Sequence, residues 1–392
     1  MSAHSAPRSG PGARRLIAVI VLVPLLAALA LWAFAWPAAR TAPHDLPIGL
    51  AGPAKATAPL EQKLTRQEGA FEIHHYADEA AARDAIKDRT VYGAVVVTAG
   101  GPKLLTASAA SPLVAQLLQQ KVAAQAAGDS GVVAEGRKAE KAKTSETSET
   151  SETAEKVKKT EKAGEAAKGA KAAKASQAKQ AKAITKVTTV DVVASSPKDP
   201  RGAALSGSVL PLALAGMAAG AVVTLLGLRG ARAVTALVGA AALVGLVGAG
   251  IADSWLGVIT GDWWAEAAAF GLSTLAVSAA VAGLAALVGS AGIGFMSGVV
   301  MLIGNPASGA SSAPQLLPEP LGAIGQWLPP GAGATLLRSV SYFDGAAATT
   351  PALTLTWWAA LGLGAVLVGS ALRNRVRAEE QAPERPVLAL AD

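Results

Sequence analysis

The 392-residue chain contains no cysteine, so disulfide bonds, thiolate nucleophiles and cysteine-based metal sites are excluded. It also has only four histidines. Two of them, His74 and His75, are adjacent in an expected strand, where successive side chains point to opposite faces and cannot jointly hold one metal ion without a bulge. No Ser/His/Asp set or pair of carboxylates is arranged for catalysis. We therefore expect no metal, no cofactor and no enzyme active site.

Two further absences concern the source of energy. The chain lacks the G-x-x-x-x-G-K-[ST] loop that cradles nucleotide phosphates. Its long apolar runs contain almost no ionisable residue, and Asp253 and Glu266 lie near the ends of such runs. Proton- or ion-coupled carriers usually keep acids or histidines in mid-membrane. If this protein moves a substrate uphill, a separate ATPase subunit would explain both absences.

Aromatic residues are scarce, at 4%, although 51% of the residues are hydrophobic. The apolar content is therefore alanine, leucine and valine, with many glycines, a mixture that suits closely packed membrane helices. For the spacings Gly216-x-x-x-Gly220 and Gly294-x-x-x-Gly298 we favour packing within the chain over contacts between subunits. The net charge of +7 arises from a lysine-rich segment and from arginines beside apolar runs, without interleaved aromatics. Membrane topology explains it better than nucleic-acid binding does.

The apolar runs predict an α-helical integral membrane protein with about six transmembrane helices. The first run, residues 16–36, could also be a cleaved signal peptide ending near Ala33-Phe34-Ala35, but its length and the nearby Pro37 favour an uncleaved span. Residues 209–372 form an expected five-helix domain, with spans at 209–228, 234–251, 265–288, 291–304 and 351–372. The tails are residues 1–15 and 373–392.

Arginines predict the orientation of these spans. Six crossings bring three arginine clusters to one face of the membrane, as the bias of positive residues toward the cytoplasm requires. We therefore expect a multi-pass plasma-membrane protein with both termini cytoplasmic and residues 41–196 extracytoplasmic. The clusters are Arg14 and Arg15, Arg229 and Arg232, and Arg373, Arg375 and Arg377.

Residues 41–196 predict a small inserted α/β domain, because strand-like and helix-like segments alternate. One segment within it, residues 135–182, is a low-complexity run of Ser-Glu-Thr triplets, lysine and alanine. It forms either a helical, coiled-coil-like stalk or a disordered protrusion. The expected strands are residues 46–51, 71–76, 91–98, 103–109 and 184–194, and the expected helices are 58–66, 78–89 and one that begins at Pro112.

The stretch from Gly304 to Phe343 separates the last two predicted spans. It is rich in proline and glycine, has few charges and carries Ile324, Trp327 and Leu328 as apolar anchors. Such a connection can re-enter the membrane or lie along its surface if its backbone groups find partners. We interpret residues 305–350 as a long outer loop that forms the rim of a substrate path.

Several short motifs in this half of the chain resemble those of ABC-2-type permeases of the YhgE/Pip-like group, in their actinobacterial form. The layout of one span, a large outer domain and five further spans is also similar to theirs. The motif-bearing residues are Asp199-Pro200-Arg201-Gly202, Gly294-Phe295-Met296, Asn305-Pro306-Ala307-Ser308-Gly309, Leu317-Pro318, Leu328-Pro329-Pro330-Gly331-Ala332-Gly333, Arg338 and Tyr342-Phe343-Asp344-Gly345.

The resemblance implies a membrane protein, a homo- or heterodimer, that acts in export with an ATP-binding cassette ATPase. We expect no nucleic-acid partner, because the basic segments lack interleaved aromatic residues. By the same resemblance, Asn305, Pro306 and Gly309 break the fifth span at its outer end, and Trp327, Pro329, Pro330 and Gly331 belong to the rim. Arg338 would pair with an acid or a lipid headgroup. The cargo would be a lipid, a peptide or a drug-like molecule.

A second class of function remains open. The chain could be a non-transporting envelope receptor or scaffold, whose outer domain binds a cell-wall or protein partner. That reading predicts binding by the outer domain and no associated ATPase. A third reading, an intramembrane enzyme, lacks the polar residues to support it.

Overall fold

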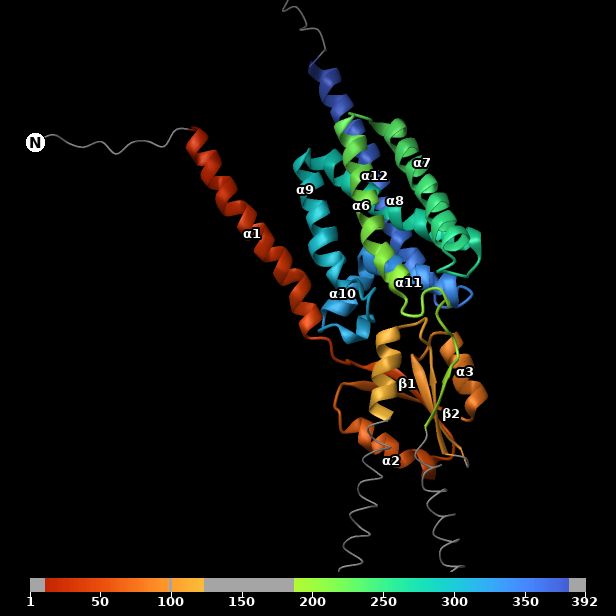
Figure 1. The fold of residues 1–392 in the computed structure, drawn as a ribbon. Coiled ribbons are helices and arrows are strands. Elements are labelled where there is room, and N and C mark those ends of the chain that lie inside the picture. The colour runs from red at the N-terminus through yellow and green to blue at the C-terminus, as the bar shows by residue number, and fades with distance from the viewer. Residues whose placement is uncertain (1–10, 99–100, 123–186, 381–392) are drawn as a thin grey trace, which may run out of the picture. The chain divides into compact units, whose positions relative to one another are not determined.

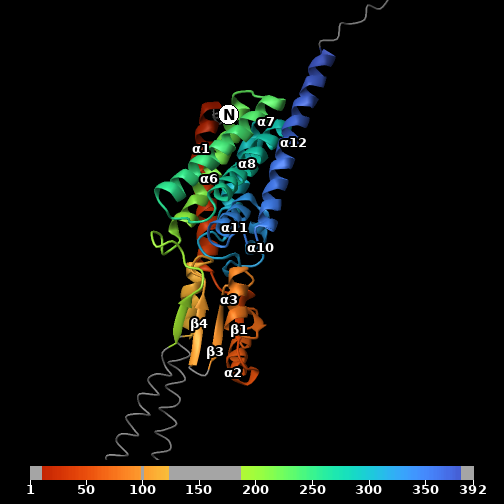
Figure 2. The same ribbon diagram turned by 90° about the vertical axis from the view of Figure 1, so that its right-hand side faces the viewer.

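The computed structural model of the protein describes residues 11–98, 101–122 and 187–380. The chain divides into two compact units (Figures 1 and 2). The α/β unit is Pro47–Ala194, and the helical unit combines Met1–Leu46 with Ser195–Asp392. The predicted insertion at residues 135–182 lies outside the described residues.

The α/β unit is built on a five-stranded mixed sheet of order β2-β1-β3-β4-β5. Strand β1 runs parallel to β3, β3 is antiparallel to β4, and β4 is parallel to β5. Strand β5 returns after the low-complexity segment and pairs with β4 through Leu105 and Val190, so the predicted closing strand is confirmed. The strands are β1 (Leu46–Ala51), β2 (Phe71–Tyr76), β3 (Gly93–Thr98), β4 (Gly101–Thr106) and β5 (Thr188–Asp191).

Two helices connect the first three strands, α2 (Ala54–Thr65) and α3 (Glu79–Lys87), and another covers residues 112–122. Asp78 caps α3, as predicted, because its carboxylate accepts a hydrogen bond from the Ala81 N–H at 2.9 Å. The face of α3 that carries Ala82, Ala85 and Ile86 is buried. Together with the apolar strands β1 and β3 it forms the core of this unit.

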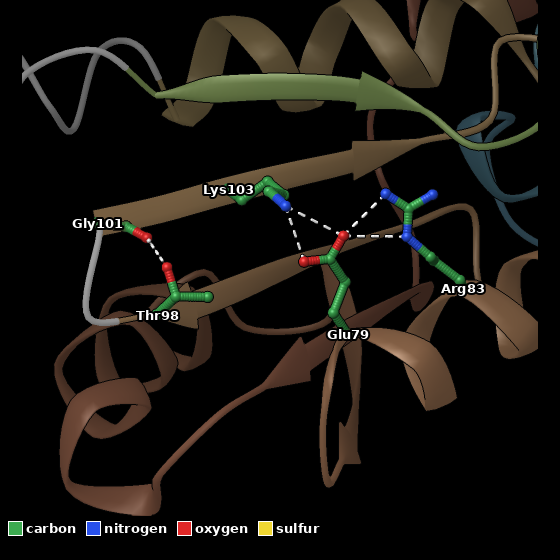
Figure 3. A network of polar contacts seen from close by, with 5 residues as sticks. All are labelled: Glu79, Arg83, Thr98, Gly101 and Lys103. Atoms are coloured by element: carbon green, nitrogen blue, oxygen red, sulfur yellow. Dashed lines mark hydrogen bonds and ion pairs between the residues drawn. The ribbon is translucent and has the colours of Figure 1, made fainter.

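A polar network joins α3 to the sheet (Figure 3). The Glu79 carboxylate accepts hydrogen bonds from Lys103 Nζ of β4 and from Arg83, each at 2.8 Å. The hydrogen bond from Lys103, with a further one from Arg83, lowers the pKa of Glu79. At the β3–β4 turn, Thr98 Oγ1 donates to the Gly101 carbonyl. Each of these groups has a structural partner, so the network positions α3 against β4.

The helical unit begins with α1 (Pro11–Ala39), continues through α6 (Ala203–Leu225) and ends with α12 (Thr349–Glu380). Four short helices are of other types: η1 and η2 are π-helices, and η3 and η4 are 3-10 helices. The remaining elements are α7 (Gly230–Ala249), η1 (Gly250–Trp255), α8 (Trp263–Val288), α9 (Ala291–Gly298), η2 (Val299–Gly304), η3 (Pro306–Ser308), η4 (Pro314–Leu316), α10 (Leu321–Trp327) and α11 (Pro329–Tyr342).

Helix α8 is the centre of this unit. It packs on α6, α7, α11 and α12 and is the most buried of the long apolar helices. Small residues allow these close contacts. A Cβ atom added at Gly216 would lie 2.7 Å from Val277 Cβ, and one at Gly220 would lie 2.6 Å from the Ser278 carbonyl oxygen. The first small-residue spacing therefore packs α6 on α8 within the chain, as expected, whereas Gly294 and Gly298 have nothing within 4 Å.

Four helices of the described residues are long and apolar enough to cross a membrane: Ala203–Leu225, Gly230–Trp255, Trp263–Val288 and Thr349–Arg375. They lie where four of the six spans were predicted. Helix α1 covers the first predicted span with 29 residues. The fifth, Ala291–Gly304, is a shorter apolar helix. At about 1.5 Å per residue it reaches about 21 Å, less than the roughly 30 Å hydrocarbon core.

Residues 305–350, expected as a loop, are instead largely helical. They contain η3, η4, α10 and α11, and α11 is buried along nearly its whole length. Proline explains the difference, because it is well tolerated in the first turn of a helix. Pro306, Pro314, Pro329 and Pro330 each occupy such a first turn. The helix breakers therefore start new short helices at this point.

Candidate functional site

A small apolar cavity, with a volume of about 20 Å³, lies between α6, α8 and α11. Pro329 and Pro330, two of the predicted rim residues, belong to its wall. Ser273 is the one hydroxyl in the lining, and its Oγ donates to the Ala269 carbonyl at 2.7 Å. The cavity therefore offers an apolar surface with little hydrogen-bonding capacity. The remaining lining residues are Val209, Leu212, Ala213, Val277, Gly333, Ala334 and Leu337.

The first turn of α11 is held against η2 and α10. A Cβ atom at Gly304, the last residue of η2, would lie 2.9 Å from Pro330 Cγ. Gln326 of α10 donates to the Ser308 carbonyl at 3.1 Å and accepts from Thr335 Oγ1 at 2.7 Å. This amide joins η3, α10 and α11, so the side of the cavity formed by Pro329 and Pro330 is braced from outside.

The predicted break at Asn305, Pro306 and Gly309 forms the η3 turn beside this wall. The Asn305 carbonyl accepts from Ser308 Oγ at 2.7 Å. Gly309 has φ +65°, and a Cβ atom there would lie 2.7 Å from the Pro314 nitrogen, so the position requires glycine. None of these three residues lines the apolar cavity. They end η2 and redirect the chain into α10.

Arg338 and Trp327 are not among the residues that line the cavity. Arg338 is buried, and its Nη2 donates to the Ala310 carbonyl at 2.9 Å, which ties α11 to the segment after η3. The Trp327 side chain is 75% exposed, and its carbonyl accepts from Trp358 Nε1 of α12 at 2.8 Å. Of the eight predicted site residues, the structure thus brings Pro329 and Pro330 to the cavity and Gly331 beside them.

A buried polar cluster lies where the loop before α8 meets the end of α11. Glu266 is fully buried, and its Oε1 accepts from the Gly261 N–H at 2.9 Å. Ser341, whose side chain interacts with the Glu266 carboxylate, is buried beside it. Tyr342 donates to the Val258 carbonyl at 2.8 Å, and burial raises the pKa of its hydroxyl to about 12. The cluster fixes α11 to this loop.

Asp199 orders the start of α6 at the same end of the helical unit. Its two carboxylate oxygens accept from the N–H groups of Ala203 and Ala204, at 2.9 and 2.7 Å. A carboxylate at this position also interacts favourably with the helix dipole. The Asp199–Gly202 motif is therefore the cap of α6, and Gly202, with φ +60°, is its N-cap residue.

No sequence pattern distinguishes the residues of α6 and α8 that line the cavity. Val209, Leu212 and Val277 are ordinary apolar residues of long apolar helices, and their neighbourhood depends on how α6 crosses α8. Glu266 was noticed only for its place near a span end. Within the described residues, no group of three or more histidine, aspartate or glutamate side chains could hold a metal ion.

Residues 14–180 match the family model described as ABC-2 family transporter protein. No curated protein and no solved structure matches the chain. The matched stretch begins in α1 and runs past strand β4, and it covers less than half of the 392 residues. It includes neither the apolar cavity nor the motif residues that resemble YhgE/Pip-like permeases.

The ABC-2 match supports a relationship to the membrane subunits of ABC transporters. Together with the four apolar helices it supports a multi-pass membrane protein. Proteins of this kind associate with a lipid bilayer and usually with an ATPase.

Proposed function

We propose that the chain is the permease subunit of an ABC-2-like exporter, which works with a separate ATPase to move a lipid, a peptide or a drug-like molecule outward. The ABC-2 match of residues 14–180 carries this proposal. The absence of a nucleotide-binding loop from the sequence is consistent with an ATPase on another chain.

The finer placement is in the YhgE/Pip-like group, with six crossings, cytoplasmic termini and an extracytoplasmic α/β unit. The arrangement of the helical unit supports an even number of membrane crossings for the whole chain. The turn after α8 lines a cavity together with Arg229 and Arg373, whereas Tyr342 of α11 contacts Val258 in the loop before α8. The segment from α9 to α11 therefore carries the chain from one end of α8 to the other, although no single helix in it is long enough.

Labelling of single cysteines tests this orientation, because the natural chain has none. Glu68→Cys lies at an exposed position of the α/β unit, and Arg232→Cys lies at an exposed position beside the start of α7. A membrane-impermeant maleimide added to intact cells is expected to label the first variant and to label the second only after lysis. The reverse pattern would contradict the proposed topology.

The export function is tested by purifying the tagged chain from its own cells and identifying associated proteins. We expect an ATPase with a nucleotide-binding loop, and ATP hydrolysis by the complex. Leu212→Trp places a large ring at the cavity wall and is expected to change that hydrolysis. Leu214→Trp, on the exposed side of the same helix, is the matched control. Equal effects of the two variants would argue against a functional cavity.

The separately folded α/β unit favours one alternative, an envelope receptor or scaffold whose outer domain binds a cell-wall or protein partner. The two proposals differ in the same purification. A chain that repeatedly co-purifies with a wall component or another envelope protein, and never with an ATPase, would support the scaffold.

A further inference from the structure

A second cavity, with a volume of about 300 Å³, lies at the other end of the helical unit. The turn after α6, the turn after α8 and the end of α12 surround it. It is more polar than the cavity beside α11, since Arg229, Arg373, Ser290 and Ser370 are among its lining residues. Neither the ABC-2 match nor the export proposal assigns a role to it.

The two arginines leave this cavity with uncompensated positive charge. Arg373 Nε is buried and has no hydrogen-bond partner. Within the part of the chain that the structure describes, no carboxylate forms an ion pair with Arg229 or Arg373. The side chains of Arg229 and Arg373 both line the cavity, so an anion bound there would supply acceptors for guanidinium donors that face the open space.

The backbone around the cavity is compatible with an anion. Arg229 is the N-cap residue of α7 and provides no side-chain cap, so the first N–H groups of that helix lack a side-chain acceptor. At the end of α6, the carbonyls of Val222, Val223 and Thr224 already accept hydrogen bonds from the following turn. Backbone N–H donors of α7 are therefore available near the cavity, whereas these three carbonyls of α6 already have hydrogen-bond partners.

The rim of the cavity is apolar and exposed. Leu225, which lines the cavity, is 74% exposed, and two residues adjacent in sequence to lining residues, Leu226 and Val288, are 70% and 60% exposed. In a membrane protein, exposed apolar residues beside a basic pocket suit the acyl chains of a lipid whose headgroup enters the pocket. The combination of a positive interior and an apolar rim therefore resembles the two ends of an anionic phospholipid.

We propose that this cavity binds a phosphate group, held by Arg229 and Arg373. The guanidinium groups match phosphate oxygens with paired donors, and Ser290 and Ser370 line the same space. The phosphate belongs either to an anionic phospholipid of the surrounding leaflet or to free phosphate. The proposal does not depend on the export function, since a non-transporting membrane protein with this cavity would bind the same group.

Binding is tested with the full-length chain in neutral detergent, titrated separately with short-chain phosphatidylglycerol and with inorganic phosphate. The test variant is Arg229→Gln with Arg373→Gln. The matched control is Arg232→Gln with Arg375→Gln, which removes the same charge from exposed positions outside the cavity lining. We expect the test variant to lose about tenfold or more in affinity, as the loss of a hydrogen bond between charged groups predicts. The control is expected to bind like the natural protein.

The two titrations separate the sources of the phosphate. Arginine-dependent binding of phosphatidylglycerol alone indicates a lipid headgroup, and comparable binding of inorganic phosphate indicates the free ion. If the glutamine variant does not melt like the natural protein, Arg229→Lys with Arg373→Lys decides. It keeps the charge but loses the paired donors, so we expect weaker binding with unchanged melting. Equal losses in the test and control variants, or no loss in either, would overturn the proposal.

Discussion

The contact between α6 and α8 can be tested with one methyl group. Gly220 of α6 faces α8, and a Cβ atom there would lie 2.6 Å from the Ser278 carbonyl oxygen and 2.9 Å from Val281 Cβ. Both distances are shorter than ordinary van der Waals contact, and the first involves backbone that cannot rotate away. Gly220→Ala therefore requires α6 to move away from α8.

The magnitude follows from two opposing effects. Overpacking by a methyl group costs about 1–3 kcal/mol. Replacing glycine by alanine in the interior of a helix contributes about 0.5–1 kcal/mol of stabilisation. The net expectation for Gly220→Ala is a loss of up to about 2.5 kcal/mol, and about 1 kcal/mol at mid-range, in the free energy of unfolding.

Gly239 of α7 provides the matched control, because it is exposed and a Cβ atom there meets nothing within 4 Å. Gly239→Ala keeps the favourable effect alone and is expected to stabilise by about 0.5–1 kcal/mol. The free energy of unfolding of both variants is measured on the purified protein with increasing concentrations of a denaturing detergent, monitored by circular dichroism. If both changes shift stability in the same direction, the packing of α6 on α8 described here is wrong.

Three further predictions concern polar groups. Glu266→Leu removes the acceptor of the Gly261 N–H and should lower the unfolding free energy by about 1–3 kcal/mol, whereas Glu266→Gln keeps an acceptor oxygen and should lose less. Lys103→Gln removes the main cause of the lowered pKa of Glu79. The variant should therefore be less stable than the natural protein above pH 4.5, the ordinary pKa of the carboxyl, and this difference should disappear as the pH falls well below that value. Amide exchange in α3 measures the difference. Burial raises the pKa of Tyr342 from 10.0 to about 12, so its contribution to stability should be complete below pH 10 and lost as the pH rises toward 12. Tyr342→Phe should abolish that loss in alkaline unfolding curves.

Each of these predictions has a contrary outcome. Equal stability of the leucine and glutamine variants at position 266 would mean that the Gly261 hydrogen bond contributes nothing. A pH-independent effect of Lys103→Gln would point to lost packing of the lysine stem. An absorbance difference between the natural protein and Tyr342→Phe that titrates near pH 10 would show a solvated hydroxyl.

Much of the α/β unit could be predicted from local signals. Alternating and β-branched residues predicted its strands, and Asp78 marked the start of α3 because its carboxylate can satisfy a free N–H of the first turn. The pairing of β5 with β4 was predicted only as the completion of a sheet. Its parallel direction and its register through Val190 depend on long-range contacts.

The segment after Gly304 shows where such reasoning fails. The prolines at Asn305-Pro306 and Pro329-Pro330 predicted breaks in the helical chain, and helices do end at both places. The local signals did not show that each proline starts a new helix, because proline is compatible with both a loop and a first helical turn. Burial of α11 against α8 decides between these conformations, and burial is a property of the assembled helices.

Long apolar helices, a polar folded segment and arginines at helix ends can all be recognised from the residues alone, because hydrophobicity and charge act at the level of single segments. Which of those helices pack together depends on the folded molecule. The packing of α6 on α8 and α11 brings Leu212 and Pro329 to the wall of one cavity, and Arg229 and Arg373 come together from distant parts of the chain at another. The cavities cannot be predicted from single segments, since their walls come from residues whose neighbours are set by packing.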